Sequence, residues 1–212
     1  MCRVLIFGDS NTWGYADSGQ KPEHVRRYPK AQRWPCVAGA LLGDGWTILE
    51  NGLNGRSTDF SIPTAEGHNG LVYLRERLAE MLPLDAAVVA LGINDLNPER
   101  CGDPAASRRA MAEILDVIRG AGVPRTVLIL PALLNERIQW PPYHGDASAA
   151  GAVDRSRELN NAYRELAGER GIPFVDAAAC AEAGADGLHL TPESHVRLGH
   201  EVAEVLAREL AG

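Results

Sequence analysis

Three residues, one near the start of the chain and two near its end, have side chains suited to nucleophilic catalysis. Ser10 ends the triplet Gly8-Asp9-Ser10, which follows the apolar run 3–7. Asp186 and His189 are close enough in sequence for one short turn to present both side chains to the same site. A serine hydroxyl attacks a carbonyl carbon when a histidine accepts its proton and a carboxylate orients the histidine ring. These residues therefore indicate acyl transfer, with Ser10 as nucleophile, His189 as base and Asp186 as the orienting group.

Each of these residues also has a plainer interpretation. Most Gly-Asp-Ser triplets are turns in which the serine caps a helix, and Asp186 could equally cap the turn that follows it. His195 and His200 are spaced as on a helix and are expected to be surface or packing residues, because functional residues favour loops. The catalytic interpretation of Ser10 therefore depends on the other residues that the fold brings to it.

Acyl transfer also needs hydrogen-bond donors, because negative charge develops on the carbonyl oxygen. Three donors are predicted: the backbone N–H groups of Ser10 and Gly55, and the side-chain amide of Asn94. Gly55 lies in the glycine-rich stretch 51–58, where the absence of a Cβ lets the backbone approach a substrate. Asn94 follows a strand-like run, and its alternative is an ordinary turn residue, because asparagine favours turns.

The alternation of apolar runs with helical patterns predicts the elements that position these residues. Strands are predicted over residues 3–7, 46–50, 86–91, 126–131 and 172–176. Helices are predicted over residues 34–42, 70–82, 104–119, 152–170 and 192–210. This order indicates an α/β fold: a flavodoxin-like three-layer α/β/α sandwich with a five-stranded, mainly parallel sheet and the first strand central. Residues 1–212 are predicted to form a single domain.

The predicted sheet places the candidate residues at one edge. The carboxyl ends of parallel strands lie side by side, and open α/β sheets bind their ligands there. Ser10, Gly55 and Asn94 each follow a different strand, while Asp186 and His189 lie in the loop before the last helix. We therefore expect all five to meet in one crevice.

The composition argues against several classes of protein. The net charge of −7 at pH 7 disfavours nucleic acid and anionic membranes, which need a basic face. No run approaches the ~20 apolar residues of a membrane span, and the first strand begins too early for a leader, so a cytoplasmic location is expected. The cysteines are widely spaced and are expected to be free thiols in or near the core. No metal or cofactor is predicted, because neither a metal-binding histidine pattern nor a G-x-G-x-x-G stretch occurs.

Four stretches of the chain resemble the conserved blocks of the SGNH (GDSL) hydrolase family and occur in the family's order. They are Gly8-Asp9-Ser10, Gly55, Gly92-Ile93-Asn94-Asp95 and Asp186-Gly187-Leu188-His189. The resemblance implies the flavodoxin-like fold and an esterase that forms an acyl-serine intermediate. It implies the same roles as the residue chemistry: Ser10, His189 and Asp186 as a catalytic triad, and Ser10, Gly55 and Asn94 as the oxyanion hole.

A closer likeness is to the bacterial arylesterase/acyltransferase branch of that family, and it is carried by residues 7–14, 33–34 and 50–58. Members of that branch act on short acyl esters, transfer acyl groups to alcohols or hydrogen peroxide, and form homo-oligomers. The resemblance implies these properties for this chain. The stretch 132–151 is less well matched to the branch, so the acyl-chain preference and the assembly stay open.

Aromatic residues after the nucleophile and in residues 140–143 indicate walls for a small pocket, and hence a short-chain, small-molecule ester as substrate. The residues predicted to line it are Asp9, Asn11, Trp13, Asn54, Ile93 and Trp140. One alternative function is that of a carbohydrate O-acetylesterase, with the same catalytic residues. The other is a non-catalytic flavodoxin-like binding module, although the phosphate-binding stretches expected of a nucleotide site are missing.

Overall fold

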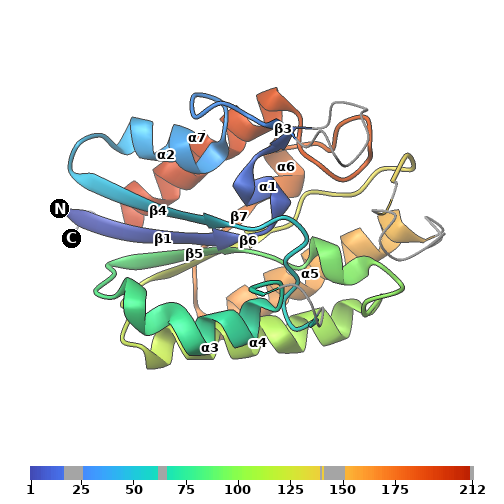
Figure 1. Ribbon diagram of the computed structural model, residues 1–212, viewed down its shortest axis with the longest axis horizontal. Helices are drawn as coiled ribbons and strands as arrows, with labels where there is room; N and C mark the ends of the chain where they lie inside the picture. The colour runs from blue at the N-terminus through green and yellow to red at the C-terminus, as the bar shows by residue number, and fades with distance from the viewer. Residues whose placement is uncertain (17–25, 62–65, 139, 141–150, 211–212) are drawn as a thin grey trace.

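The computed structural model describes residues 1–16, 26–61, 66–138, 140 and 151–210 (Figure 1). Its main sheet has five strands in the order β4-β1-β5-β6-β7. They are β1 (Cys2–Gly8), β4 (Trp46–Gly52), β5 (Ala86–Ala90), β6 (Thr126–Leu130) and β7 (Phe174–Asp176). Every pairing between them is parallel. The predicted five-stranded sheet of an α/β fold is confirmed.

Helices cover both faces of the sheet, which gives the predicted three-layer sandwich (Figure 1). On one side lie α2 (Trp34–Leu42), α6 (Ala177–Cys180) and α7 (Pro192–Leu210). On the other side lie α3 (Gly70–Met81), α4 (Pro104–Gly120) and α5 (Ala152–Arg170). None of the helices in the described part of the chain combines the length and apolar character that crossing a bilayer requires.

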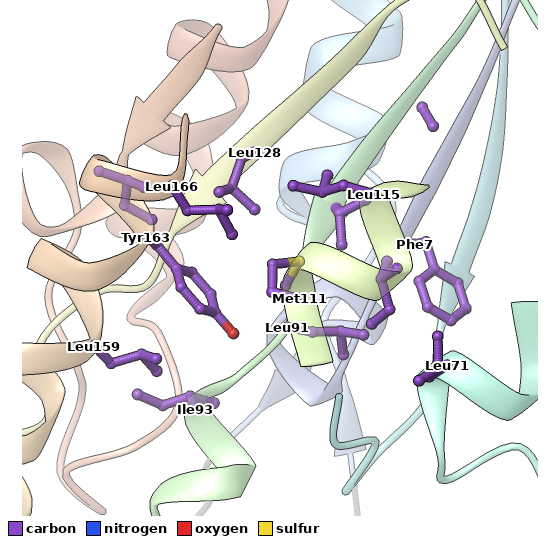
Figure 2. Close-up of a cluster of buried hydrophobic side chains, with 14 of the residues drawn as sticks. Phe7, Leu71, Leu91, Ile93, Met111, Leu115, Leu128, Leu159, Tyr163 and Leu166 are labelled. Carbon is purple, nitrogen blue, oxygen red and sulfur yellow. The ribbon is translucent and has the colours of Figure 1, made fainter. Parts of the chain in front are cut away.

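The strands are apolar on both sides because each face of the sheet packs against helices. Successive side chains of a strand point to opposite faces, so Leu5 and Phe7 of β1 enter the core on the α3–α5 side. Val4 and Ile6 enter the core on the α2 and α7 side. Figure 2 shows part of the first cluster, in which Phe7 lies beside Leu71 of α3. Such continuous apolar runs are typical of parallel strands buried on both faces.

One detail of the sheet differs from the prediction. The first strand is interior but not central: β1 lies between the edge strand β4 and the middle strand β5. The chain moves outward from β1 to β4 and then crosses back to β5, so the direction of winding reverses between β1 and β5. Open α/β sheets bind ligands at such a reversal, and the segments that follow these two strands carry Ser10 and Asn94.

Several short elements were not among the predicted strands and helices. They are α1 (Ser10–Trp13), the 3₁₀-helix η2 (Ile93–Leu96), α6, and an antiparallel pair of β2 (Tyr15–Ala16) and β3 (Arg26–Arg27). Each is too short to show a helical or alternating period. The cysteines are free thiols, as predicted. Cys101 was predicted to lie in or near the core, but it is exposed in the turn before α4.

The segment α1 packs so closely on the end of β4 that a side chain is excluded there. A Cβ on Gly52 would lie 2.2 Å from the backbone nitrogen of Trp13 and 2.7 Å from the carbonyl carbon of Thr12. Both neighbours are backbone atoms, which cannot move aside as a flexible side chain can.

We therefore expect Gly52→Ala to lower the free energy of unfolding by about 1–3 kcal/mol, the usual cost of overpacking. Gly45→Ala is the matched control, because a Cβ on Gly45 meets nothing within 4 Å. Urea denaturation of both variants measures the effect. Equal midpoints for the two variants would contradict the close packing of α1 on β4.

Candidate active site

Ser10 is presented by a sharp turn at the carboxyl end of β1. The chain leaves β1 at Gly8 and enters the short helix α1 at Ser10. The Asp9 carboxylate accepts a hydrogen bond of 2.9 Å from the Asn11 N–H, and so caps α1. Gly14 ends α1 with a φ of 87°, a left-handed conformation that favours glycine. Ser10 is held at a fixed place, and the residue is only 3% exposed.

The loop before α7 brings Asp186 and His189 together. The Asp186 Oδ1 accepts hydrogen bonds of 2.9 Å from the backbone N–H groups of Leu188 and His189. Its Oδ2 lies 2.5 Å from the His189 Nδ1. Burial raises the pKa of Asp186, but the hydrogen bonds and charge of His189 outweigh burial, so the pKa lies below its ordinary value. The aspartate is therefore a carboxylate that holds the Nδ1–H tautomer of the ring, leaving Nε2 as a proton acceptor.

Gly187 is required at the centre of this turn. Its φ is 75°, and a Cβ on it would lie 2.4 Å from the backbone nitrogen of Ile138. The neighbouring Asn135 binds the same loop, with its backbone N–H donating to the Gly187 carbonyl at 3.2 Å and its side-chain amide to the Gly184 carbonyl at 3.1 Å. The segment after β6 therefore supports the turn that carries Asp186 and His189.

The two turns meet at Ser10 and His189. The His189 Nε2 lies 3.0 Å from the Ser10 Oγ, although the residues are 179 positions apart. Asn11 joins the turns beside this contact: its Oδ1 accepts from the Leu190 N–H at 2.9 Å, and its Nδ2 donates to the Leu188 carbonyl at 3.3 Å. The amide of Asn11 thus binds the backbone on both sides of His189. A relay of Ser10, His189 and Asp186 results, in the order that a serine nucleophile needs.

The three predicted oxyanion donors belong to segments bound to the same strand end. The Leu53 N–H donates to the Gly8 carbonyl at 3.1 Å, which fixes the loop containing Gly55 beside the Ser10 turn. The Asn94 Nδ2 donates to the Arg56 carbonyl at 3.0 Å, which fixes the amide and leaves its second N–H available. The backbone N–H groups of Ser10 and Gly55 donate no hydrogen bond to any of the described residues.

Arg56 holds this loop from inside the protein. Its side chain is almost completely buried, at 2% exposed for the residue, and burial lowers its pKa to about 10. The guanidinium donates to the Gly8 carbonyl at 3.0 Å, the Asn51 carbonyl at 2.8 Å and the Gly67 carbonyl at 2.9 Å. It also lies 4.3 Å from the centre of the Phe7 ring. Arg56 thereby connects the ends of β1 and β4 to the Gly55 loop.

A small cavity, with a volume of about 40 Å³, lies between the Ser10 turn and the core on the α2 and α7 side. Ser10, Gly55, Asn94 and His189 are not among the residues that line it. Both chain neighbours of Ser10, Asp9 and Asn11, line it, together with Ile93 and Leu188. Most of the other lining residues are apolar, among them Leu91 and Ile129. One water molecule needs about 10–15 Å³ of such space, so the cavity accommodates a group of roughly three heavy atoms.

The remaining predicted pocket residues lie elsewhere. Trp13 lies beneath Arg27, whose Cζ is 5.0 Å from the ring centre. Trp140 is buried, at 8% exposed, in the hydrophobic cluster on the α3–α5 side rather than in this cavity. Asn54 is half-buried beside Gly55 and does not line the cavity. Residues 141–143, the rest of the predicted aromatic wall, lie outside the described residues.

Two histidines, His195 and His200, were predicted to have surface or packing roles, and the structure describes both. His195 is completely buried, and its Nδ1 accepts a hydrogen bond of 3.4 Å from the Trp34 N–H. Burial lowers the pKa of His195 to about 4, so it is a neutral packing residue at pH 7. His200 is exposed on α7. Both placements agree with the expectation of surface or packing roles.

Sequence reasoning missed a ring that stacks on the candidate base. Tyr15 lies against His189, with ring centroids 3.9 Å apart. It also missed Arg56 and the bridging role of Asn11. Only the resemblance in residues 50–58 pointed to the neighbourhood of Arg56, and nothing in the local sequence relates positions 11 and 15 to position 189.

The carboxyl group of Asp9 is buried beside this site, at 4% exposed. Burial raises its pKa from 3.8 to about 6. The unfolded chain has the ordinary value, so the folded protein binds the proton more tightly. The stability contributed by Asp9 therefore increases as the pH falls from about 6 to about 4, and ionised Asp9 costs stability above pH 6.

We expect Asp9→Asn, which keeps the helix cap, to be more stable than the parent at pH 7.5 by roughly 1–3 kcal/mol. At pH 4 the two proteins should be nearly equal, because Asp9 is then neutral. Urea denaturation at both pH values measures this, with Asp44→Asn as the control at an exposed turn. A difference that is the same at both pH values would show that the Asp9 charge is not responsible.

Comparisons with known proteins agree with this arrangement. The model of the GDSL-like lipase/acylhydrolase family matches residues 6–197. A solved carbohydrate acetylesterase from Sinorhizobium meliloti is 32% identical, with a TM-score of 0.88 over 99% of this chain and 100% of that one. The aryl esterase of M. smegmatis is 29% identical, with a TM-score of 0.86 over the same shares. Comparison with curated proteins gives no match.

The chain belongs to the GDSL-like lipase/acylhydrolase family, since the family model covers most of its length. This is the SGNH family that the sequence blocks resembled, and its structural neighbours are esterases. The protein is therefore an esterase or acylhydrolase in class.

Proposed function

We propose that the protein is a serine esterase that hydrolyses short-chain acyl esters of small molecules through an acyl-serine intermediate. The observation that carries the proposal is the relay of 3.0 Å from Ser10 Oγ to His189 Nε2 and 2.5 Å from His189 Nδ1 to Asp186. In this reaction Ser10 is the nucleophile, His189 the general base and Asp186 the group that orients the ring.

The geometry supports two half-reactions. The Ser10 Oγ attacks the ester carbonyl carbon while its proton moves to the His189 Nε2. The resulting oxyanion is stabilised by the N–H groups of Ser10 and Gly55 and the Asn94 amide. The tetrahedral species collapses, and the leaving alcohol takes the proton from His189. A water molecule then attacks the acyl-serine in the same way and releases the carboxylic acid.

We propose that the acyl group enters the cavity behind the Ser10 turn, because Asp9 and Asn11, on either side of Ser10, line it; its size then favours a small acyl group. A space of about 40 Å³ that is lined by Asp9, Asn11, Ile93 and Leu188 suits an acetyl group, with its three heavy atoms, better than a fatty acyl chain. Its largely aliphatic lining suits the methyl group of acetate. We therefore place acetyl esters first among the substrates.

Ser10→Ala and His189→Ala should each lower kcat by about 10³-fold or more, and the double variant should lose little further, because the groups act as a unit. Steady-state hydrolysis of p-nitrophenyl acetate measures this, and a fluorophosphonate should label the parent but not Ser10→Ala. Losses that multiply in the double variant, or labelling that survives in Ser10→Ala, would contradict a shared nucleophilic step.

The acyl preference is tested with p-nitrophenyl acetate, butyrate and octanoate. We expect kcat/KM to fall along this series by about tenfold or more from acetate to octanoate, because a longer chain exceeds the cavity. Ile93→Gly, which removes a side chain from the wall and so enlarges the cavity, should reduce the difference in kcat/KM between acetate and octanoate. Octanoate turned over faster than acetate by the parent would overturn the assignment of the cavity to the acyl group.

A second candidate function is that of a carbohydrate O-acetylesterase. The observation that favours it is the likeness to the Sinorhizobium meliloti structures, which are described as carbohydrate acetylesterases. Both functions need the same residues and differ only in the alcohol part of the ester. Comparing acetylated xylose with phenyl acetate separates them, and adding an alcohol or hydrogen peroxide as acceptor tests acyl transfer. The homo-oligomeric assembly and cytoplasmic location stay predictions.

A further inference from the structure

Tyr15 lies flat against the imidazole of the candidate base. The ring centroids of Tyr15 and His189 are 3.9 Å apart, and the ring planes are inclined by only 21°. Tyr15 is the first residue of β2 and directly follows Gly14, the glycine that ends α1. The tyrosine therefore covers one face of a ring whose two nitrogens contact Ser10 and Asp186.

Two hydrogen bonds do not by themselves fix the plane of an imidazole. The bonds at Nδ1 and Nε2 define a line through the ring, and the His189 ring can still rock about that line. Rocking tilts the Nε2 lone pair relative to the Ser10 oxygen, because the lone pair lies at an angle to that line, and a general base must point at the proton that it takes. A flat neighbour in contact with one face prevents this motion, because rocking either opens the stack or drives the rings together.

The stack also acts on the charge that develops in the reaction. His189 becomes a cation when it accepts the serine proton. The face of an aromatic ring carries partial negative charge and attracts a cation more strongly than a neutral group. An interaction that is stronger in the transition state than in the ground state raises kcat rather than substrate affinity.

The strand that carries Tyr15 is anchored by Arg27 in the paired strand β3, where the two residues lie opposite each other. The Arg27 Nε donates to the Trp13 carbonyl at 2.6 Å, and its guanidinium pairs with Glu50 on β4. Glu50 also accepts hydrogen bonds of 2.9 and 3.0 Å from Arg33. Arg27 thus ties the β2–β3 pair to α1 and to the edge of the main sheet.

We propose that Tyr15 is a positioning residue for this reaction: its ring fixes the plane of the His189 imidazole and stabilises the cation that His189 becomes. The proposal rests on the esterase function proposed above. Tyr15 acts through His189, so it affects the chemical step more than substrate binding.

The first test compares Tyr15→Phe with Tyr15→Leu, using p-nitrophenyl acetate. Phenylalanine keeps the aromatic face, and we expect kcat and KM within about twofold of the parent. Leucine keeps apolar bulk but has no π face, and we expect kcat to fall about tenfold with KM within about twofold. A Tyr15→Leu variant with the kcat of Tyr15→Phe overturns the proposal.

The second test repeats Tyr15→Leu in the His189→Ala background. If Tyr15 acts through His189, the residual turnover should change by less than about twofold, because the partner ring is gone. A tyrosine that merely forms a wall of the substrate pocket would act in both backgrounds and would change KM. An equal loss in both backgrounds therefore also overturns the proposal.

The third test leaves Tyr15 unchanged and removes contacts that hold the strand pair carrying it. It therefore tests the proposal even if Tyr15→Leu fails to fold. Arg27→Met removes the bonds to Trp13 and Glu50, and we expect kcat to fall about threefold with KM unchanged. Arg26→Met is the matched control on the same strand, since Arg26 is exposed and forms no ion pair among the described residues. Equal kcat values for these two variants would count against the proposal.

Failure of the proposed function gives a different result. If Ser10→Ala keeps the turnover of the parent, the serine esterase itself is wrong. If Ser10→Ala is inactive while Tyr15→Leu matches the parent, the esterase stands and only the role of Tyr15 is refuted.

Discussion

The candidate site depends on one side-chain amide that joins two turns from opposite ends of the chain. Asn11 binds the backbone carbonyl of Leu188 and the backbone N–H of Leu190, the neighbours of His189 on either side. The backbone of His189 therefore cannot move relative to the Ser10 turn without breaking one of these bonds. Asn11 can act in this way because Asp9 caps α1 and fixes the start of the helix. The proposed proton transfer, whose rate a misplacement of about 1 Å can lower about 10²-fold, thus depends on a residue that takes no part in it.

Buried charges hold the other half of the site, and they cost stability in doing so. Arg56 has no buried carboxylate bound to it in the described residues and satisfies its guanidinium on backbone carbonyls instead. Asp95, also fully buried, accepts from the N–H and hydroxyl of Thr58 at 3.0 and 2.8 Å. Apolar side chains in place of Arg56 and Asp95 would avoid the free-energy cost of desolvating buried charges. They could not, however, form hydrogen bonds with the carbonyl and N–H groups of three separate segments. The bonds keep the loop of Gly55 and the helix of Asn94 at the end of β1.

Much of this arrangement could be predicted from the sequence, and the reasons for the rest are physical. Apolar runs and helical periods located the strands and most helices, because burial on both faces of a sheet leaves a local pattern. Ser10, Asp186 and His189 were predicted as a catalytic set because their chemistry is specific, and the structure brings the three side chains into contact. Tyr15 was not, since a ring contact across more than 170 positions leaves no local pattern. Trp140 was predicted at a pocket wall because aromatic loop residues often line pockets, but it packs in the hydrophobic core instead.

The contact between Ser10 and His189 spans 179 positions, and this separation has a consequence for the newly made protein. A ribosome adds about 5–20 residues per second, so the serine leaves the ribosome roughly 10–40 s before the histidine that is proposed to activate it. During that interval the amino-terminal strands and helices can assemble, but the serine remains an ordinary alcohol. Under the proposed function, hydrolytic activity arises only after His189 has been synthesised. A product of interrupted translation would carry the complete Gly-Asp-Ser turn and no reactive nucleophile.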